Sequence, residues 1–199
     1  MEANSYNPFS LVGKTILVTG ASSGIGKEYA TILASKYGYD LILVSNQQKQ
    51  LEELSAELTK TYHVKAHVYY CDLSSEGIAQ TIYQWCEQQG YEVEVLINNA
   101  GMFFWEPLIE ASEGKIHTML MLHMVTLAEL CRQFAPAMCQ RRHGYILNMS
   151  SMTAWITIPG IQCYNSTKAF VLSFSKSLWY ELKPYGVGVT TLTPGAIDT

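Results

Sequence analysis

Residues 15–26 read Thr-Ile-Leu-Val-Thr-Gly-Ala-Ser-Ser-Gly-Ile-Gly, and this stretch decides the fold. Its first five residues are mostly β-branched and apolar, which is typical of a strand buried on both faces. The glycines that follow allow a tight turn, and the apolar spacing from Ile25 onward predicts a helix that stops at Gly38. The order strand, glycine turn, helix indicates the first unit of an α/β fold.

The same alternation continues along the chain. The expected strands cover residues 15–19, 40–44, 65–70, 93–97, 144–148 and 188–193. After the helix that begins at Ile25, the further helices are expected over residues 47–61, 75–88, 112–141 and 161–182. On the helix over 112–141, one apolar stripe holds Ile116, Leu120, His123, Leu127, Leu130 and Phe134. Because strands that alternate with helices form parallel sheets, we expect one domain over residues 1–199 with a doubly wound parallel sheet, the Rossmann fold.

Composition narrows the classes of function. Only 15% of the residues are charged, against roughly 25% in an average domain, so much surface is buried and self-association would fit. The net charge is −4 and no basic cluster is present, so we expect no nucleic-acid partner. No apolar run reaches the length of a membrane span, and residues 1–10 do not resemble a secretory signal. Five cysteines at irregular spacings fit reduced thiols, and we expect a cytoplasmic protein without a metal site.

Polar motifs follow the predicted strands, and ligands of such sheets bind beyond the carboxyl ends of the strands. The first glycine turn would let backbone approach a pyrophosphate and would point a helix N-terminus at it. Its Gly-x-x-x-Gly-x-Gly spacing differs from the Gly-x-Gly-x-x-Gly fingerprint, so a plain strand-to-helix turn is the alternative. Asp72 could accept from an adenine amine or cap a helix. Asn98 and Asn99 could be ordinary turn residues.

Tyr164 and Lys168 are four residues apart in a helix-forming run, so they project from the same helical face. A phenol has a pKa of about 10. An ammonium one turn away would stabilise the phenolate and move this pKa toward a range useful for proton transfer. Ser151 lies thirteen residues before Tyr164, and its hydroxyl would hydrogen-bond the substrate oxygen that exchanges a proton with the phenol. Taken alone, a Tyr-x-x-x-Lys pair is also common on amphipathic surfaces.

Taken together, these motifs resemble the short-chain dehydrogenase/reductase family over nearly the whole chain. The matching motifs, in the family's order, are Thr19 to Gly26, Asp72, Asn98 to Gly101, Ser151, Tyr164 to Lys168, and Pro194-Gly195. The resemblance implies a nicotinamide cofactor and reversible carbonyl/alcohol chemistry. It implies that Ser151 holds the substrate oxygen, that Tyr164 protonates it, and that Lys168 lowers the Tyr164 pKa while binding ribose hydroxyls. It also selects Ser151 over its neighbour Ser150 as the catalytic serine.

The resemblance implies a set of cofactor-binding residues as well. They are Gly20, Ser22, Ser23, Gly24, Ile25, Gly26, Ser45, Asn46, Asp72, Leu73, Asn99, Ala100, Gly101, Tyr164, Lys168, Pro194, Gly195 and Thr199. After the second strand, an acidic residue selects NAD and a basic one NADP. Ser45 and Asn46 are neutral and Lys49 is near, so we expect NADP(H) to be preferred over NAD(H). Lys49 as a solvated helix charge is the alternative.

Two features depart from the family pattern. Thirteen residues before Pro136, where the family often has an asparagine that completes the catalytic set, this chain has His123. One interpretation is a buried histidine with satisfied ring nitrogens. The other is a catalytic role, in which His123 orients a water on the proton path from Lys168. The chain also ends at Thr199, where the family continues with a substrate-covering segment, so we expect this lid to be absent from the sequence.

The substrate and the partners are less defined. The loops near the predicted site carry Met102, Phe103, Phe104, Trp105 and Trp155, which suggest an apolar substrate such as a steroid, acyl chain or aromatic ketone. The alternative is that these side chains pack under the absent segment. The run after Tyr164 loosely resembles the branch that reduces long-chain 3-oxoacyl substrates. We expect a homodimer or homotetramer through the two long helices.

Three functions are compatible with the motifs. The first is an NADP-preferring oxidoreductase that acts on a secondary alcohol or its ketone. The second is an NADP(H)-binding sensor without turnover, and the third is an interaction domain. The presence of Ser151, Tyr164 and Lys168 together favours the enzyme, because a binding module has no need of all three.

Overall fold

Six parallel strands form the centre of the protein in the computed structural model, which describes residues 14–196. The strands are β1 Thr15–Thr19, β2 Asp40–Ser45, β3 Ala66–Tyr70, β4 Val93–Asn98, β5 Gly144–Met149 and β6 Val187–Leu192. Their order across the sheet is β3-β2-β1-β4-β5-β6, and every neighbouring pair is parallel. The predicted doubly wound sheet is confirmed. Its order reverses between β1 and β4, where ligands of such sheets bind.

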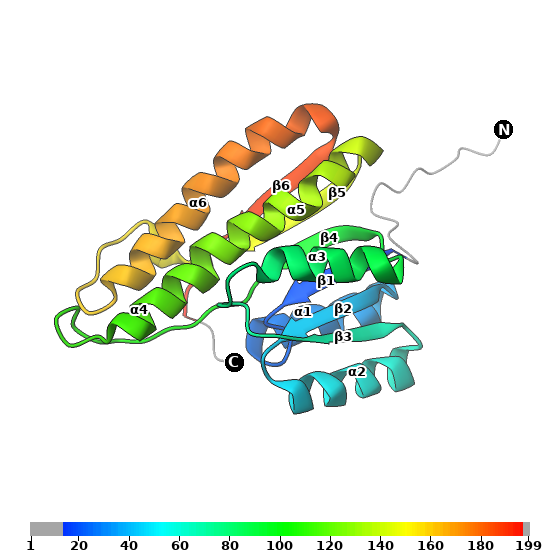
Figure 1. Ribbon diagram of the computed structural model, residues 1–199, viewed down its shortest axis with the longest axis horizontal. Coiled ribbons are helices and arrows are strands. Elements are labelled where there is room, and N and C mark those ends of the chain that lie inside the picture. The colour runs from blue at the N-terminus through cyan, green and yellow to red at the C-terminus, as the bar shows by residue number, and fades with distance from the viewer. Residues whose placement is uncertain (1–13, 197–199) are drawn as a thin grey trace.

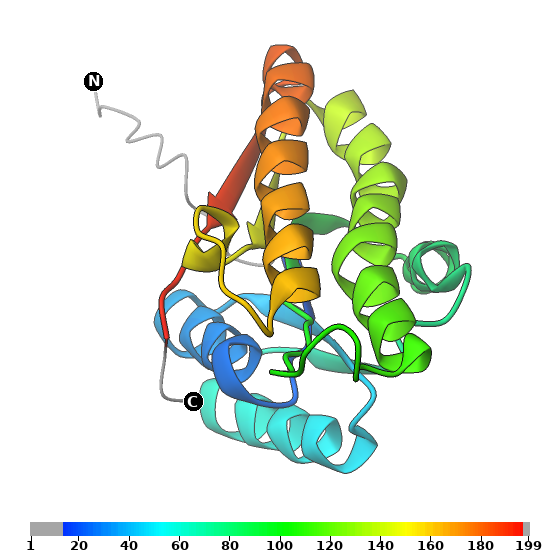
Figure 2. The ribbon, with the colours of Figure 1, turned by 90° about the vertical axis from the view of Figure 1, so that its left-hand side faces the viewer.

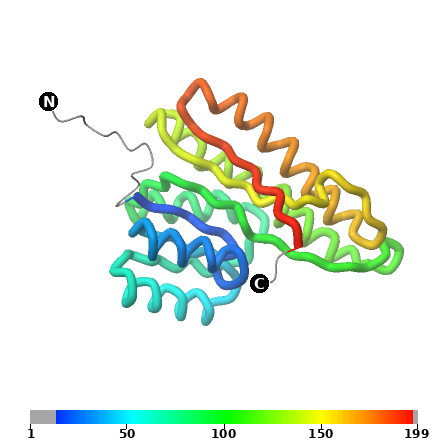
Figure 3. Tube along the Cα trace, turned by 180° about the vertical axis from the view of Figure 1, so that it is seen from behind, coloured from blue at the N-terminus to red at the C-terminus, as the bar shows by residue number. Residues whose placement is uncertain are grey.

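Helices cover both faces of the sheet (Figure 1). They are α1 Gly24–Tyr37, α2 Gln48–Tyr62, α3 Ile78–Gln89, α4 Glu113–Leu120, the π-helix η1 Met121–Val125, α5 Thr126–Arg141 and α6 Gln162–Leu182, with short 3₁₀ turns η2 Met152–Ala154 and η3 Lys183–Tyr185. Figures 1 and 2 show α5 and α6 running side by side on one face. The view from behind in Figure 3 has α1 and α2 on the opposite face.

Two hydrophobic cores lie on the two faces of the sheet. Along β1, Leu17 points to the core under α3, α5 and α6, whereas Ile16 and Val18 point to the core under α1 and α2. In β2, Ile42 packs in the first core and Leu43 in the second, and all five side chains are at most 1% exposed. Because successive side chains of a strand face opposite sides, a strand buried on both faces needs the continuous apolar run seen in the sequence.

The prediction of one continuous helix over residues 112–141 is wrong in one respect. A π-turn at Met121–Val125 separates α4 from α5 and adds a residue to one turn of the helix. The apolar stripe changes phase there, because Met119 is fully buried and the predicted stripe residue Leu120 is 37% exposed. His123 lies inside the π-turn and is 1% exposed.

Two features bear on the predicted environment. Within residues 14–196, no helix combines the length and the apolar character needed to cross a membrane. All five cysteines are free thiols. Burial raises the pKa of Cys71, Cys86 and Cys131 to about 12, so these three thiols stay protonated at neutral pH.

Candidate active site

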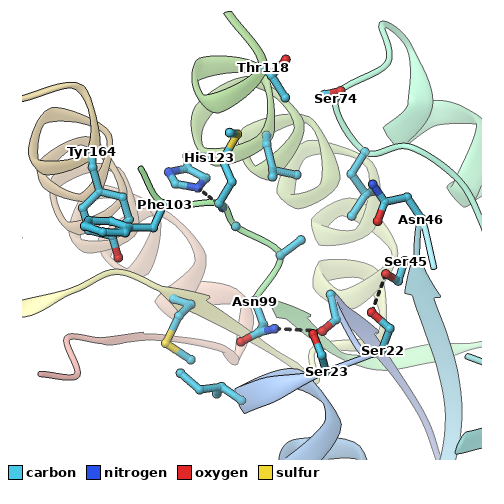
Figure 4. A pocket seen from close by; sticks show the side chains of 18 of the residues that line it. Ser22, Ser23, Ser45, Asn46, Ser74, Asn99, Phe103, Thr118, His123 and Tyr164 are labelled. Carbon is cyan, nitrogen blue, oxygen red and sulfur yellow. Dashed lines mark hydrogen bonds between the residues drawn. The ribbon is translucent and has the colours of Figure 1, made fainter. Parts of the chain in front are cut away.

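The carboxyl ends of the strands border one cavity of about 880 Å³ (Figure 4). This volume lies within the roughly 300–1,000 Å³ of small-molecule sites. The predicted residues that line it are Gly20, Ser22, Ser23, Ile25, Ser45, Asn46, Asp72, Leu73, Asn99, Ala100, Gly101, His123, Ser151, Tyr164, Lys168, Pro194 and Gly195. Thr199 lies outside the described residues. The cavity therefore brings the glycine turn, the strand ends and the Tyr-x-x-x-Lys helix together.

Two predicted glycines, Gly24 and Gly26, are not among the residues that line the cavity. Gly24 begins α1 with φ of 51°. A Cβ on Gly26 would lie 2.1 Å from the Gly20 carbonyl oxygen and 2.6 Å from Asn99 Nδ2. Gly26 thus allows α1 to approach the ends of β1 and β4, and its role is close packing.

Thr19 and Asn99 join the ends of β1 and β4. The Thr19 hydroxyl donates to the Ile97 carbonyl at 3.2 Å and accepts from the backbone N–H groups of Asn99 and Ala100 at 2.9 and 3.0 Å. Asn99 Nδ2 donates to the carbonyls of Thr19 and Gly20 at 3.1 and 3.4 Å. Asn99 therefore connects the end of β4 to the end of β1 and is more than an ordinary turn residue. Its hydrogen bonds fix the backbone that borders the cavity.

The end of β2 borders the cavity with neutral polar groups. The Ser22 and Ser45 hydroxyls are buried and hydrogen-bonded to each other at 2.8 Å, as Figure 4 shows. Asn46 is exposed beside them, and Gln47, which the sequence analysis missed, also lines the cavity. Lys49 is 85% exposed and lies 3.8 Å from Glu53 on the same helix. Lys49 is thus the solvated helix charge of the alternative interpretation.

Asp72 forms a turn after β3. Its Oδ1 accepts from the backbone N–H and the hydroxyl of Ser74 at 2.8 and 2.7 Å. Asp72 is not the N-cap of α3, because that helix begins at Ile78 after Gly77 in the left-handed conformation. The turn uses one carboxylate oxygen, and Oδ2 can accept a hydrogen bond from a ligand. Thr126 of α5 holds this loop by donating its hydroxyl to the Leu73 carbonyl at 2.7 Å.

Lys168 is 4% exposed, and its ammonium donates to the Met149 carbonyl at 2.9 Å. Burial lowers the pKa of Lys168 to about 8. The Ser150 hydroxyl donates to the Lys168 carbonyl at 2.7 Å, so this neighbouring serine anchors α6. Ser151 is instead hydrogen-bonded to Tyr164, and the Met152 N–H donates to the Pro194 carbonyl at 2.9 Å, which brings the Pro-Gly motif beside it.

The expected lowering of the Tyr164 pKa by Lys168 is not what the structure shows. Burial raises the Tyr164 pKa above its usual value, and the hydrogen bond with Ser151 opposes this shift. The ammonium of Lys168 lies 5.5 Å from the centre of the Tyr164 ring and is directed at a backbone carbonyl. The phenol is therefore protonated at neutral pH, which is the state that a general acid needs.

His123 fits the interpretation of a buried, satisfied histidine. Its Nε2 accepts from the Met102 N–H and its Nδ1 is bonded to the Thr167 hydroxyl, each at 2.9 Å. Burial, and then the charge of Lys168, lower the His123 pKa to about 3. Because both ring nitrogens have protein partners, the side chain has none left to orient a water, and the predicted relay role is not supported.

The aromatic loops divide between the cavity and the surface. Met102 and Phe103 line the cavity, and the Phe103 ring meets the Tyr164 ring edge-on at 5.1 Å. Phe104 is not among the lining residues, and neither are Trp105 and Trp155, which are 65% and 63% exposed.

Sequence reasoning missed several further residues of the cavity wall. They are Gln47, Cys71, Ser74, Thr118, Leu122, Met149 and Ser150. Five of them flank predicted motifs and could have been found as their neighbours. Thr118 and Leu122 lie on the helix over 113–125 and had no signal of their own, because the π-turn decides what faces the cavity there.

Comparisons with known proteins agree with this geometry. A family model described as short chain dehydrogenase matches residues 14–199. The very-long-chain 3-oxoacyl-CoA reductase-A of Danio rerio is 33% identical over 192 residues, which cover 94% of this chain and 59% of that relative. The chain therefore spans less than two thirds of that relative's length.

Solved structures give the same result. The bulky-bulky ketone specific alcohol dehydrogenase from Comamonas testosteroni superposes with a TM-score of 0.88 at 30% identity, covering 93% of this chain and 73% of that one. A short-chain dehydrogenase from Sphingobium yanoikuyae in complex with NADPH gives 0.88 at 32% identity, covering 93% and 72%. Both similarities cover almost all of the described residues.

Proposed function

Because the chain belongs to the short-chain dehydrogenase family, we propose that it transfers a hydride between NADP(H) and a secondary alcohol or its ketone. One observation carries the proposal. A single cavity is bordered by the glycine turn after β1 and also by Ser151, Tyr164 and Lys168. A nucleotide held by the turn would extend toward a general acid and a hydrogen-bond donor, which is the arrangement that carbonyl reduction needs.

The residues of the cavity fit a dinucleotide. Gly20 has φ of 65° and presents bare backbone to the cavity, where a pyrophosphate can approach. The carboxylate of Asp72 is an acceptor for an adenine amine. When bound, the nicotinamide supplies or takes the hydride. Lys168, charged below its pKa of about 8, would bind the ribose hydroxyls.

The proton chemistry falls to the side chains of the chain itself. Ser151 would donate to the substrate oxygen as negative charge grows on it, and Tyr164 would transfer its phenolic proton there. The raised pKa of Tyr164 keeps that proton in place until the transfer. The hydrogen bond from Ser151 would then stabilise the phenolate. Oxidation of an alcohol would reverse these steps.

NADP(H) is the cofactor that we propose as preferred. Ser45 ends β2 and Asn46 follows it, and neither is acidic, so neither repels a 2′-phosphate. Gln47 adds an amide donor on the same wall of the cavity. The Sphingobium yanoikuyae relative, which was crystallised with NADPH, supports the choice.

For the substrate, we propose a ketone with a long or bulky apolar substituent. Met102 and Phe103 form the wall beside Tyr164, and the Phe103 ring is 56% exposed. An exposed aromatic ring at the mouth of a site favours apolar contact with a ligand. The names of the Danio rerio reductase and the Comamonas testosteroni dehydrogenase, which refer to acyl and bulky ketone substrates, support this class.

One observation favours a second candidate, an NADP(H)-binding protein without turnover. Both ring nitrogens of His123 are occupied, so the side chain at this position does not hold a relay water for Lys168. If the proton path depends on such a water, cofactor binding would survive and reduction would not. The two candidates differ in a single measurable property, the oxidation of bound NADPH by a ketone.

The test is a fluorescence titration of the protein with NADPH and NADH, followed by a ketone screen. We expect tighter binding of NADPH, and loss of NADPH absorbance with bulky aryl ketones and 3-oxoacyl thioesters. Binding without oxidation of NADPH by any ketone would reject the enzyme in favour of the sensor. Binding of neither nucleotide would reject both.

Replacing Ser45 with aspartate should reverse the cofactor preference. A carboxylate at this position would repel the 2′-phosphate of NADPH and accept from the ribose hydroxyl of NADH. We expect the ratio of the NADPH and NADH dissociation constants to shift by roughly 10-fold to 100-fold toward NADH, since each 1.4 kcal/mol is tenfold. The control is Ser45→Asn, because asparagine has the shape of aspartate without its charge. An equal shift in both variants would contradict the electrostatic explanation.

A further inference from the structure

His123 lies between the two halves of the candidate site. It is in the π-turn η1, it is 1% exposed, and the mechanism above gives it no role. On one side it contacts the loop after β4, and on the other it contacts α6. Figure 4 shows its ring between Tyr164 and that loop, with the hydrogen bond drawn.

The hydrogen bonds of His123 have a defined direction. The Met102 backbone N–H can only donate, so Nε2 must be the unprotonated nitrogen. A neutral ring then carries its proton on Nδ1 and donates it to the Thr167 hydroxyl. That hydroxyl donates in turn to the backbone carbonyl of Tyr164 at 2.8 Å. Three bonds of consistent direction thus connect the loop to the residue that carries the phenol.

The loop is also fitted closely around the ring. A Cβ on Gly101 would lie 3.1 Å from His123 Nε2, which is tighter than ordinary contact. Phe103, one residue after Met102, meets the Tyr164 ring edge-on, with 5.1 Å between the ring centres. The centre of the His123 ring lies 5.8 Å from the centre of the same tyrosine ring. The position of this loop therefore decides how the wall of the cavity meets the phenol.

We propose that His123 is a positioning residue, which as a neutral Nδ1–H imidazole couples the loop over residues 101–103 to α6 and sets Tyr164 against the substrate wall. The proposal rests on the proposed function. A protonated ring would direct an Nε2–H at the Met102 N–H and break the link. Tyr164 packs against the ring and the charge of Lys168 acts on it, both from α6, and burial together with this charge keeps the ring neutral.

Two amide substitutions test separately the hydrogen bonds that His123 forms with Met102 and with Thr167. A glutamine oxygen at position 123 reaches about as far as Nε2 and can still accept from Met102, whereas an asparagine amide reaches only as far as Nδ1. Because glutamine keeps the Met102 bond and loses the bond to Thr167, we expect His123→Gln to lower kcat about tenfold. We expect His123→Asn to lose about tenfold in kcat with KM little changed, and His123→Leu about 100-fold, the cost of a displacement near 1 Å. A relay role would instead let His123→Asn keep or raise kcat, because asparagine is the residue that the family often has there.

The link to α6 has its own matched pair. Thr167 is fully buried, and Thr167→Val removes its hydroxyl while nearly preserving its shape. Thr167→Ser keeps the hydroxyl. We expect Thr167→Val to lower kcat about tenfold and Thr167→Ser to change it less than threefold, with NADPH affinity unchanged in both. Equal losses in the two variants would indicate packing as the cause and would overturn the coupling.

Ring nitrogen NMR of the protein tests the proposal without any turnover. We expect His123 to show a proton on Nδ1 and none on Nε2 from pH 5 to pH 8, and nuclear Overhauser contacts between Phe103 and Tyr164 that disappear in His123→Leu. An Nε2–H tautomer, titration within this range, or ring contacts that persist in His123→Leu would overturn it. If these signals are as expected and no ketone is reduced by the wild type, the proposed function fails and the structural coupling stands.

Discussion

Replacing Tyr164 with phenylalanine should abolish ketone reduction and leave NADPH binding nearly unchanged. The substitution removes only the hydroxyl, and the ring keeps its contacts with Phe103 and His123. Loss of a positioned general acid costs about 10²-fold to 10⁴-fold in rate. Since the same hydroxyl is hydrogen-bonded to Ser151, we expect a loss near the upper end of this range.

The measurement is the rate of NADPH oxidation at saturating ketone, together with the NADPH dissociation constant. The matched control is Tyr83→Phe, which removes a hydroxyl that donates to Glu87 at 2.9 Å on α3. We expect this control to retain the rate of the wild type. Comparable turnover in Tyr164→Phe would remove the phenol from the mechanism, and an equal loss in both variants would point to a general destabilisation.

Replacing Gly26 with alanine should abolish cofactor binding and destabilise the fold. The added Cβ would lie 2.1 Å from the Gly20 carbonyl oxygen, which real contacts do not allow, so α1 must move away from the end of β1. That movement would break the approach of Asn99 to Gly20 and reshape the backbone that borders the cavity. Overpacking of this kind costs about 3 kcal/mol of the free energy of unfolding.

The measurement is chemical unfolding followed by circular dichroism, with NADPH titration of the folded variant. Gly114→Ala is the control, because Gly114 lies in α4 with open space around its Cβ position. A glycine-to-alanine change within an exposed helix is stabilising by about 0.5–1 kcal/mol. The prediction is contradicted if Gly26→Ala unfolds like the wild type and binds NADPH with wild-type affinity.

Most of the fold could be predicted because a strand that is buried on both faces needs a continuous apolar run, which is visible in the sequence. Each strand lies within one residue of the range expected from its apolar run. The start of α3 at Ile78 was harder to predict, because Gly77 adopts a left-handed conformation that ends the preceding turn. The π-turn could not be predicted, because the one residue it adds only shifts the phase of the apolar stripe.

The candidate site also has features that the sequence could predict and features that it could not. Motif spacing was enough to bring the glycine turn, Ser151 and Tyr164 to one cavity, because the topology places the ends of parallel strands together. Spacing could not give the direction of the Lys168 ammonium, which depends on where the Met149 carbonyl ends β5. It also could not decide between the two interpretations of His123, because both require the same residue at the same place.

The π-turn at Met121–Val125 has a consequence for how this protein could be stabilised. A regular α-helix would bond its backbone better, so substitutions that convert this turn to regular α-helix without changing its length are a route to a more stable helix. That conversion would rotate every upstream side chain by about 100° relative to α5, which moves Thr118 from the cavity wall and returns Leu120 to the buried stripe. Stability and site geometry thus make opposite demands on this segment. Selection for thermal resistance alone would be expected to remove the feature that holds His123 in place.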